Sequence, residues 1–194
     1  MSGEYLVLIS HLSALTWLFI LIKHYKKEFF NLFLFLNLST VAAFIMLFVF
    51  RHNTNGPMIF FSLLVILELI KKNFPGIKFK IFFVAASLAV SLFSFIVNLP
   101  LTSMSFLLII CVIITALFIR KIILNLAYNA EVNLLHLLLL FYFLTVLFKL
   151  NNALLGVNLG MFYFVIFEFI HILFGISFCF ITEKTKVFRF NPLT

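Results

Sequence analysis

The sequence predicts an all-α polytopic integral membrane protein, a bundle of seven transmembrane helices with its N-terminus outside and its C-terminus inside. Of 194 residues, 65% are hydrophobic and only 10% are charged, which leaves too little polar surface to cover a water-soluble globule. The apolar residues form seven runs, most of them close to the ~20 residues that a helix needs to cross a hydrocarbon core of ~30 Å. The basic residues gather in every second gap between these runs.

Each expected span is an apolar run bounded by charged or turn-forming residues. The first starts after Glu4, and because no basic segment precedes it we expect a retained span, not a signal peptide. The third is the shortest, at about 14 residues, and Pro57 at its start suits the first position of a helix. The tight turn at Pro100 predicts that the fourth and fifth spans are antiparallel neighbours. The expected spans are residues 5–22, 29–50, 57–70, 81–98, 101–119, 132–150 and 157–182.

The distribution of basic residues predicts the orientation. Twelve of the fourteen Lys and Arg residues fall in the first, third and fifth gaps and in the tail, and the opposite side carries only Arg51 and Lys149. Basic residues stay on the cytoplasmic side, so this bias places the C-terminus inside. If the short third span did not cross, the ratio of basic residues on the two sides would fall to 10 against 4. Seven spans therefore agree better with the positive-inside distribution. Ten residues are expected to anchor helix ends at the inner interface: Lys23, Lys26, Lys27, Lys71, Lys72, Arg120, Lys121, Lys184, Lys186 and Arg189.

The rest of the chain adds no second domain to this plan. Residues 1–194 are expected to form one transmembrane helical domain without a soluble domain, because no polar stretch is long enough to bury a core. Residues 122–131 are mixed in polarity and are expected either to lie along the inner interface or to extend the fifth helix. The net charge of +8 is explained by anionic head groups and not by nucleic acid. We expect a multi-pass protein of a bacterial inner membrane or an organellar inner membrane.

Four polar residues lie deeper in the spans than the helix ends, and they form the candidate site: Glu168, His171, His136 and Asn37. Glu168 and His171 are three residues apart and share a helix face, on which Gly175 allows close approach of another helix. At ~1.5 Å per residue the four are expected at similar depths, as one buried polar layer. Ionisable residues inside a bilayer indicate a ligand site or a proton relay. The alternative is hydrogen bonding between helices, worth about 0.6 kcal/mol each.

The absence of certain motifs limits the function classes. The chain has no Asp, which excludes an aspartyl protease pair, and its single Glu-x-x-His falls short of the two that carboxylate-bridged metal bundles use. We therefore expect no catalytic residues, no metal site, no cofactor and no enzymatic activity. The leading hypothesis is a packing subunit of a larger membrane complex, with the lipid bilayer and other membrane subunits as partners. The alternatives are a small transporter or channel with the Glu/His site, and a seven-helix sensor that signals through a separate cytoplasmic partner.

Overall fold

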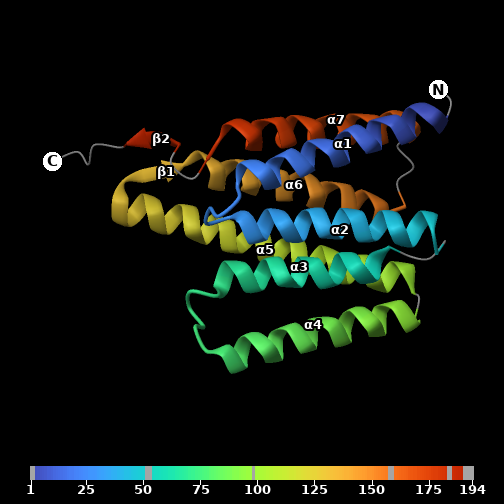
Figure 1. Cartoon of the computed structure of the whole chain (residues 1–194), viewed down its shortest axis with the longest axis horizontal. Helices are drawn as coiled ribbons and strands as arrows, with labels where there is room; N and C mark the ends of the chain where they lie inside the picture. The colour runs from blue at the N-terminus through green and yellow to red at the C-terminus, as the bar shows by residue number, and fades with distance from the viewer. Residues whose placement is uncertain (1–2, 51–53, 98, 157–159, 183–184, 190–194) are drawn as a thin grey trace.

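The computed structural model describes residues 3–50, 54–97, 99–156, 160–182 and 185–189, which form helices and one short β-ribbon (Figure 1). Each expected span contains one helix, so the all-helical prediction is confirmed. The elements are α1 (Gly3–Lys23), α2 (Phe30–Phe48), α3 (Asn55–Ile70), α4 (Ile77–Val97), α5 (Pro100–Asn129), β1 (Glu131–Asn133), α6 (Leu134–Leu154), α7 (Gly160–Phe180) and β2 (Lys186–Arg189).

The length and composition of the helices indicate a membrane protein. Within the described residues, four helices are long and apolar enough to cross a membrane, namely α2, α4, α5 and α6. Two shorter apolar helical segments, Asn55–Ile70 and Val165–Phe180, lie among them. Figure 1 shows all seven helices running along one common direction. Helix α1 begins at what we call the N-terminal end of the bundle, and α7 ends at the opposite, C-terminal end.

Six of the helices form a closed ring. Helix α1 packs against α2 and α7, α2 against α3, α3 against α5, α5 against α6, and α6 against α7. Helix α4 lies outside this ring, on α3. The prediction that the fourth and fifth spans are antiparallel neighbours is therefore wrong for most of their length. They meet near their turn, where the Ser94 and Ser103 hydroxyls lie 2.7 Å apart, but α4 takes α3 as its packing partner.

Two close helix contacts explain how the bundle is assembled. The Ser91 hydroxyl of α4 donates to the Gly56 carbonyl of α3 at 2.8 Å. Between α1 and α7, a Cβ added at Gly175 would lie 2.6 Å from the Thr16 methyl carbon, so these helices approach closely only because residue 175 is glycine. The expected role of Gly175 in close helix approach is confirmed.

The C-terminal end of the bundle carries two features beyond the expected spans. Helix α5 continues through residues 122–129, about 12 Å past Lys121, so this segment extends the fifth helix. The helix stops at Ala130, which has a left-handed backbone conformation with φ of 49°. Directly after it, β1 pairs with β2 in antiparallel register, with Val132 opposite Phe188. This ribbon joins the segment after α7 to the connection between α5 and α6.

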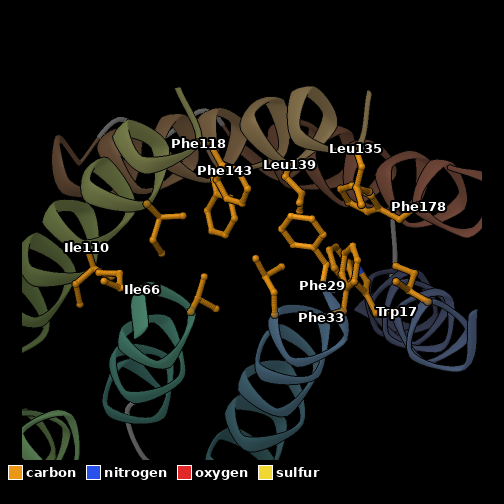
Figure 2. Packing of buried hydrophobic residues seen from close by; sticks show 14 of the residues in the cluster. Trp17, Phe29, Phe33, Ile66, Ile110, Phe118, Leu135, Leu139, Phe143 and Phe178 are labelled. Atoms are coloured by element: carbon orange, nitrogen blue, oxygen red, sulfur yellow. The ribbon is translucent and has the colours of Figure 1, made fainter. Parts of the chain in front are cut away.

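Buried aliphatic and aromatic side chains form the core of the bundle (Figure 2), and the aromatic ones contact one another closely. The Trp17 ring lies 5.0 Å from the Tyr142 ring and 5.9 Å from the Phe178 ring, and Phe33 lies 5.2 Å from Phe178. Next to these rings, a His24 ring nitrogen hydrogen-bonds to the backbone carbonyl of Phe178 at 2.9 Å. We call Trp17, Phe33, Tyr142 and Phe178 the aromatic cluster. It joins α1, α2, α6 and α7 through apolar contacts.

Candidate functional site

The ring encloses a cavity of about 670 Å³ on the N-terminal side of the aromatic cluster. Residues from all six ring helices line this cavity, and Thr54, the N-cap residue of α3, lines it as well. Much of the lining is apolar, and Trp17 and Tyr142 belong to both the cavity and the cluster. Polar lining side chains include Ser39, Thr40, Tyr142, Lys149, Glu168 and His171. The cavity is therefore a mixed polar and apolar chamber inside the bundle.

An ion pair between α6 and α7 supplies the charges of this cavity. Lys149 Nζ lies 3.2 Å from Glu168 Oε1, and the two side chains are 33% and 11% exposed. Glu168 lies eight residues into α7 and Lys149 five residues before the end of α6, about 12 and 8 Å from the N-terminal end along their helices. Each charge compensates the burial of the other. Both side chains also line the cavity, so a molecule inside would meet a cation and an anion.

His171 lies one helical turn beyond Glu168 and lines the same cavity. Its ring centroid is 5.5 Å from that of Tyr142. Its Nε2 atom is buried and makes no hydrogen bond to any described residue. An imidazole nitrogen donates or accepts according to its tautomer, and leaving it buried without a partner costs free energy. His171 is therefore suited to a polar group that enters the cavity.

The other two predicted site residues lie elsewhere. The buried Asn37 amide donates to the backbone carbonyls of Trp17 and Phe33, both at 3.0 Å, which links α2 to α1 and matches the alternative of hydrogen bonding between helices. His136 is the third residue of α6, at the C-terminal end, with its ring 5.2 Å from that of Phe29.

The structure therefore brings Glu168 and His171 together but does not form the expected single layer of four residues. His136 belongs to the first turn of its helix, whereas Glu168 lies near the middle of α7. The edges of the apolar runs do not show where α6 and α7 begin, so they do not give the depths of His136 and Glu168 within the bundle.

Lys149 is the site residue that the sequence analysis missed. Lys149 stands at the edge of the expected sixth span, but α6 continues to Leu154 and places Lys149 inside the helix. One signal was present in the sequence, because Lys149 is a lone cation in an apolar run on the side where Arg51 is the only other basic residue. A charge in such a place calls for a buried partner.

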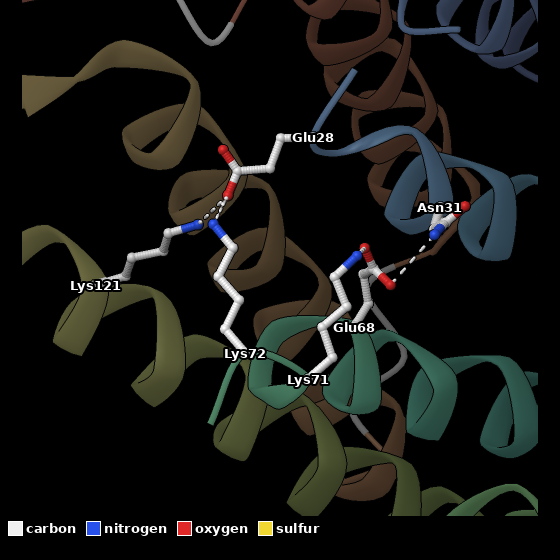
Figure 3. A network of polar contacts seen from close by, with 6 residues as sticks. All are labelled: Glu28, Asn31, Glu68, Lys71, Lys72 and Lys121. Atoms are coloured by element: carbon white, nitrogen blue, oxygen red, sulfur yellow. Dashed lines mark hydrogen bonds and ion pairs between the residues drawn. The ribbon is translucent and has the colours of Figure 1, made fainter. Parts of the chain in front are cut away.

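The basic residues expected at the inner interface gather at the C-terminal end. Lys23 ends α1, Lys26 and Lys27 follow it, Lys71 and Lys72 follow α3, Arg120 and Lys121 lie within α5, and Lys186 and Arg189 belong to β2. Lys184 lies outside the described residues. Figure 3 shows the contacts between three of these segments.

Two carboxylates connect these basic residues. Glu28, in the connection between α1 and α2, lies 2.9 Å from Lys72 Nζ and 3.5 Å from Lys121 Nζ. Partial burial by itself raises the pKa of Glu28, but the hydrogen bond from Lys72 and the positive charges of Lys121 and Lys72 outweigh it, so the pKa is lowered. Glu68 pairs with Lys71, three residues further along the chain.

The donor set of the cavity fits binding better than metal chemistry. Within the described part of the chain, no group of three or more His, Cys, Asp or Glu side chains is arranged to hold a metal ion. One carboxylate, one ammonium and one imidazole can instead hold a polar ligand or pass a proton. No protein-family model, curated protein or solved structure matches this chain.

Proposed function

We propose that the chain crosses a bacterial or organellar inner membrane seven times, with its N-terminus outside and its C-terminus inside, and transports a small molecule through the cavity. Seven helices, an odd number, connect the N-terminal end of the bundle to the C-terminal end. The 12-to-2 distribution of basic residues favours the C-terminal end as the cytoplasmic one. In this orientation the cavity belongs to the outer half of the protein, and the aromatic cluster separates it from the inner side.

One observation carries the proposal: the Lys149–Glu168 ion pair lines a cavity instead of being packed against protein. Charges inside membrane proteins are costly and mark substrate or proton pathways. A volume of about 670 Å³ is in the range of small-molecule sites, roughly 300–1,000 Å³. The mixed lining favours a solute with a charged end and an apolar body. A zwitterion would place its carboxylate on Lys149 and its ammonium on Glu168.

The two other function classes stay predictions. A packing subunit needs helix contacts and lipid-facing surfaces, and it has no use for an ion pair that lines a cavity. A sensor would use the cavity for binding alone, with its signal passed on by a separate cytoplasmic partner. Transport adds the requirement that the aromatic cluster opens toward the inner side, so the three classes differ in measurable behaviour.

Uptake into proteoliposomes tests the proposal. The probes are labelled aliphatic and aromatic amino acids as zwitterions, and labelled monocarboxylates as anions. Ala43 lines the cavity, so Ala43→Trp should fill it, and Glu168→Gln should remove its anion. The matched control is Ala85→Trp, because Ala85 is exposed on α4, outside the ring.

Each outcome decides between the classes. Uptake by the wild type and by Ala85→Trp, lost in Ala43→Trp and reduced in Glu168→Gln, would support transport. Saturable binding without uptake would favour the sensor. Neither binding nor uptake, together with a stoichiometric partner set in native purification, would contradict the proposal in favour of the complex subunit.

A further inference from the structure

We infer that a second site, at the C-terminal end of the bundle, binds a phosphate-bearing molecule with a net negative charge, either an anionic phospholipid or a soluble phosphate ester. The site is a pocket of about 200 Å³ between the α1–α2 connection, the end of α3 and the middle of α5. We call it the basic pocket. Its charged lining residues are Glu28, Glu68, Lys71, Lys72, Arg120 and Lys121.

The basic pocket has an excess of positive charge. Four cations face two carboxylates, which leaves a formal charge of +2. Glu28 takes Lys72 and Lys121 as partners, and Glu68 takes Lys71. These ion pairs hold the lysines in place around the pocket (Figure 3). An anion with one negative charge would halve this excess, and one with two would neutralise it.

Arg120 is the residue best placed to bind that anion. It is exposed, lines the pocket, and has no ion-pair or hydrogen-bond partner among the described residues. The planar guanidinium offers paired N–H donors that match two oxygens of a phosphate. Lysines beside it add charge without fixed geometry. The pocket therefore combines one guanidinium that orients the phosphate with several ammonium groups that attract its negative charge.

The apolar part of the lining favours a lipid as the source of the phosphate. Leu69 and Ile70 of α3 and Leu117 and Leu124 of α5 line the same pocket. A soluble phosphate would use only the cations, whereas a phospholipid would also bring its glycerol ester and the first acyl carbons against these side chains. Basic pockets between transmembrane helices on the cytoplasmic side bind anionic head groups in this way. Only the choice of leaflet rests on the orientation proposed above.

Native mass spectrometry of the detergent-purified chain tests this inference. Phosphatidylglycerol and phosphatidylcholine are added in parallel, and retained lipid is measured for the wild type, Arg120→Gln, Arg120→Lys and a control. The control is Lys78→Gln, because Lys78 is exposed at the start of α4 and does not line the pocket. We expect the wild type and the control to retain phosphatidylglycerol preferentially, Arg120→Gln to bind it about tenfold more weakly, and Arg120→Lys to lie between.

Competition identifies the source of the phosphate. If inorganic phosphate or glycerol 3-phosphate displaces phosphatidylglycerol, the site accepts soluble phosphates; if neither does, it is a lipid site. Both results support a phosphate site. Equal retention of the two lipids by the wild type, or equal retention of phosphatidylglycerol by the wild type and Arg120→Gln at unchanged unfolding temperature, would overturn it. Solute uptake through the cavity does not enter this experiment, so the two proposals fail separately.

Discussion

Replacing Lys149 by Met removes the positive partner of Glu168, which is the less exposed of the two charged side chains in the cavity. Glu168 keeps its carboxylate with a side chain that is only 11% exposed. Replacing Glu168 by Gln does the reverse and leaves a lysine that is 33% exposed. Because a flexible ammonium reaches water more easily than a short buried carboxylate, the first variant should lose more stability than the second. The double variant carries neither charge.

The geometry sets the size of the effect. Two unit charges 3.2 Å apart attract by about 5 kcal/mol at an effective dielectric constant of about 20. Desolvation of both ions offsets much of this attraction, and the partial exposure of Lys149 to the cavity reduces it further. We expect Lys149→Met to cost about 2–3 kcal/mol, Glu168→Gln about 1 kcal/mol, and the double variant about 1 kcal/mol. The coupling free energy of the cycle is then about 2–3 kcal/mol in magnitude.

Equilibrium unfolding in mixed detergent micelles measures these differences. Trp17 is the only tryptophan and lies in the aromatic cluster beside the cavity, so its fluorescence reports the loss of packing there. Cavity-lining Ser39→Ala serves as a control that removes a polar lining group without touching a charge. Additive free energies in the cycle, within about 0.5 kcal/mol, would refute the idea that this ion pair is a coupled, buried interaction.

Three further predictions follow from the described contacts. Gly175→Ala should destabilise the fold by about 1–3 kcal/mol, because its Cβ would meet Thr16, whereas Gly76→Ala should be neutral, since nothing lies within 4 Å; thermal unfolding of both variants checks this. The pKa of Glu28 lies below its ordinary value of 4.5. The Glu28 carboxylate therefore stabilises the fold fully above pH 4.5, and this stabilisation is lost as the pH falls through the lowered pKa. Glu28→Gln should remove this part of the acid dependence of unfolding. His24→Phe should cost about 1–3 kcal/mol, because it removes a fully buried hydrogen bond to an α7 carbonyl, and hydrogen exchange at the end of α7 should rise.

The helices were predictable because apolar runs and polar gaps have lengths that a bilayer dictates. The order of helices in the ring was not. A helix that is apolar on every side carries no stripe that identifies its packing face, so the sequence does not show that α4 lies outside. The tight turn at Pro100 even predicted a wrong partner, because a short connection fixes only the nearest turn. The β-ribbon escaped prediction since strands of three and four residues are too short for alternation to be recognised.

The candidate site was predicted in part for a similar reason. Glu168 and His171 share one helix, so their spacing was enough to place them together. Lys149 lies on another helix and contacts Glu168 only through tertiary packing, which a local sequence pattern does not predict. His136 and Asn37 were separated from the pair because depth within a span depends on where each helix begins. A charge in an apolar run indicated that a partner lies within the bundle, and the structure identifies the partner of Glu168 as Lys149.

Cysteine labelling tests the proposal that the cavity lies in the outer half of the protein and that the aromatic cluster separates it from the inner side. In a background with Cys111 and Cys179 replaced by Ala, Ser39→Cys places a thiol on the cavity wall, and Ser91→Cys places one in the buried contact between α3 and α4. We expect a membrane-impermeant thiol reagent to modify the Ser39→Cys variant from the outside of sealed, right-side-out vesicles and to leave Ser91→Cys unmodified. Modification of Ser39→Cys only after the inner face is exposed, or equal protection of both variants, would contradict it.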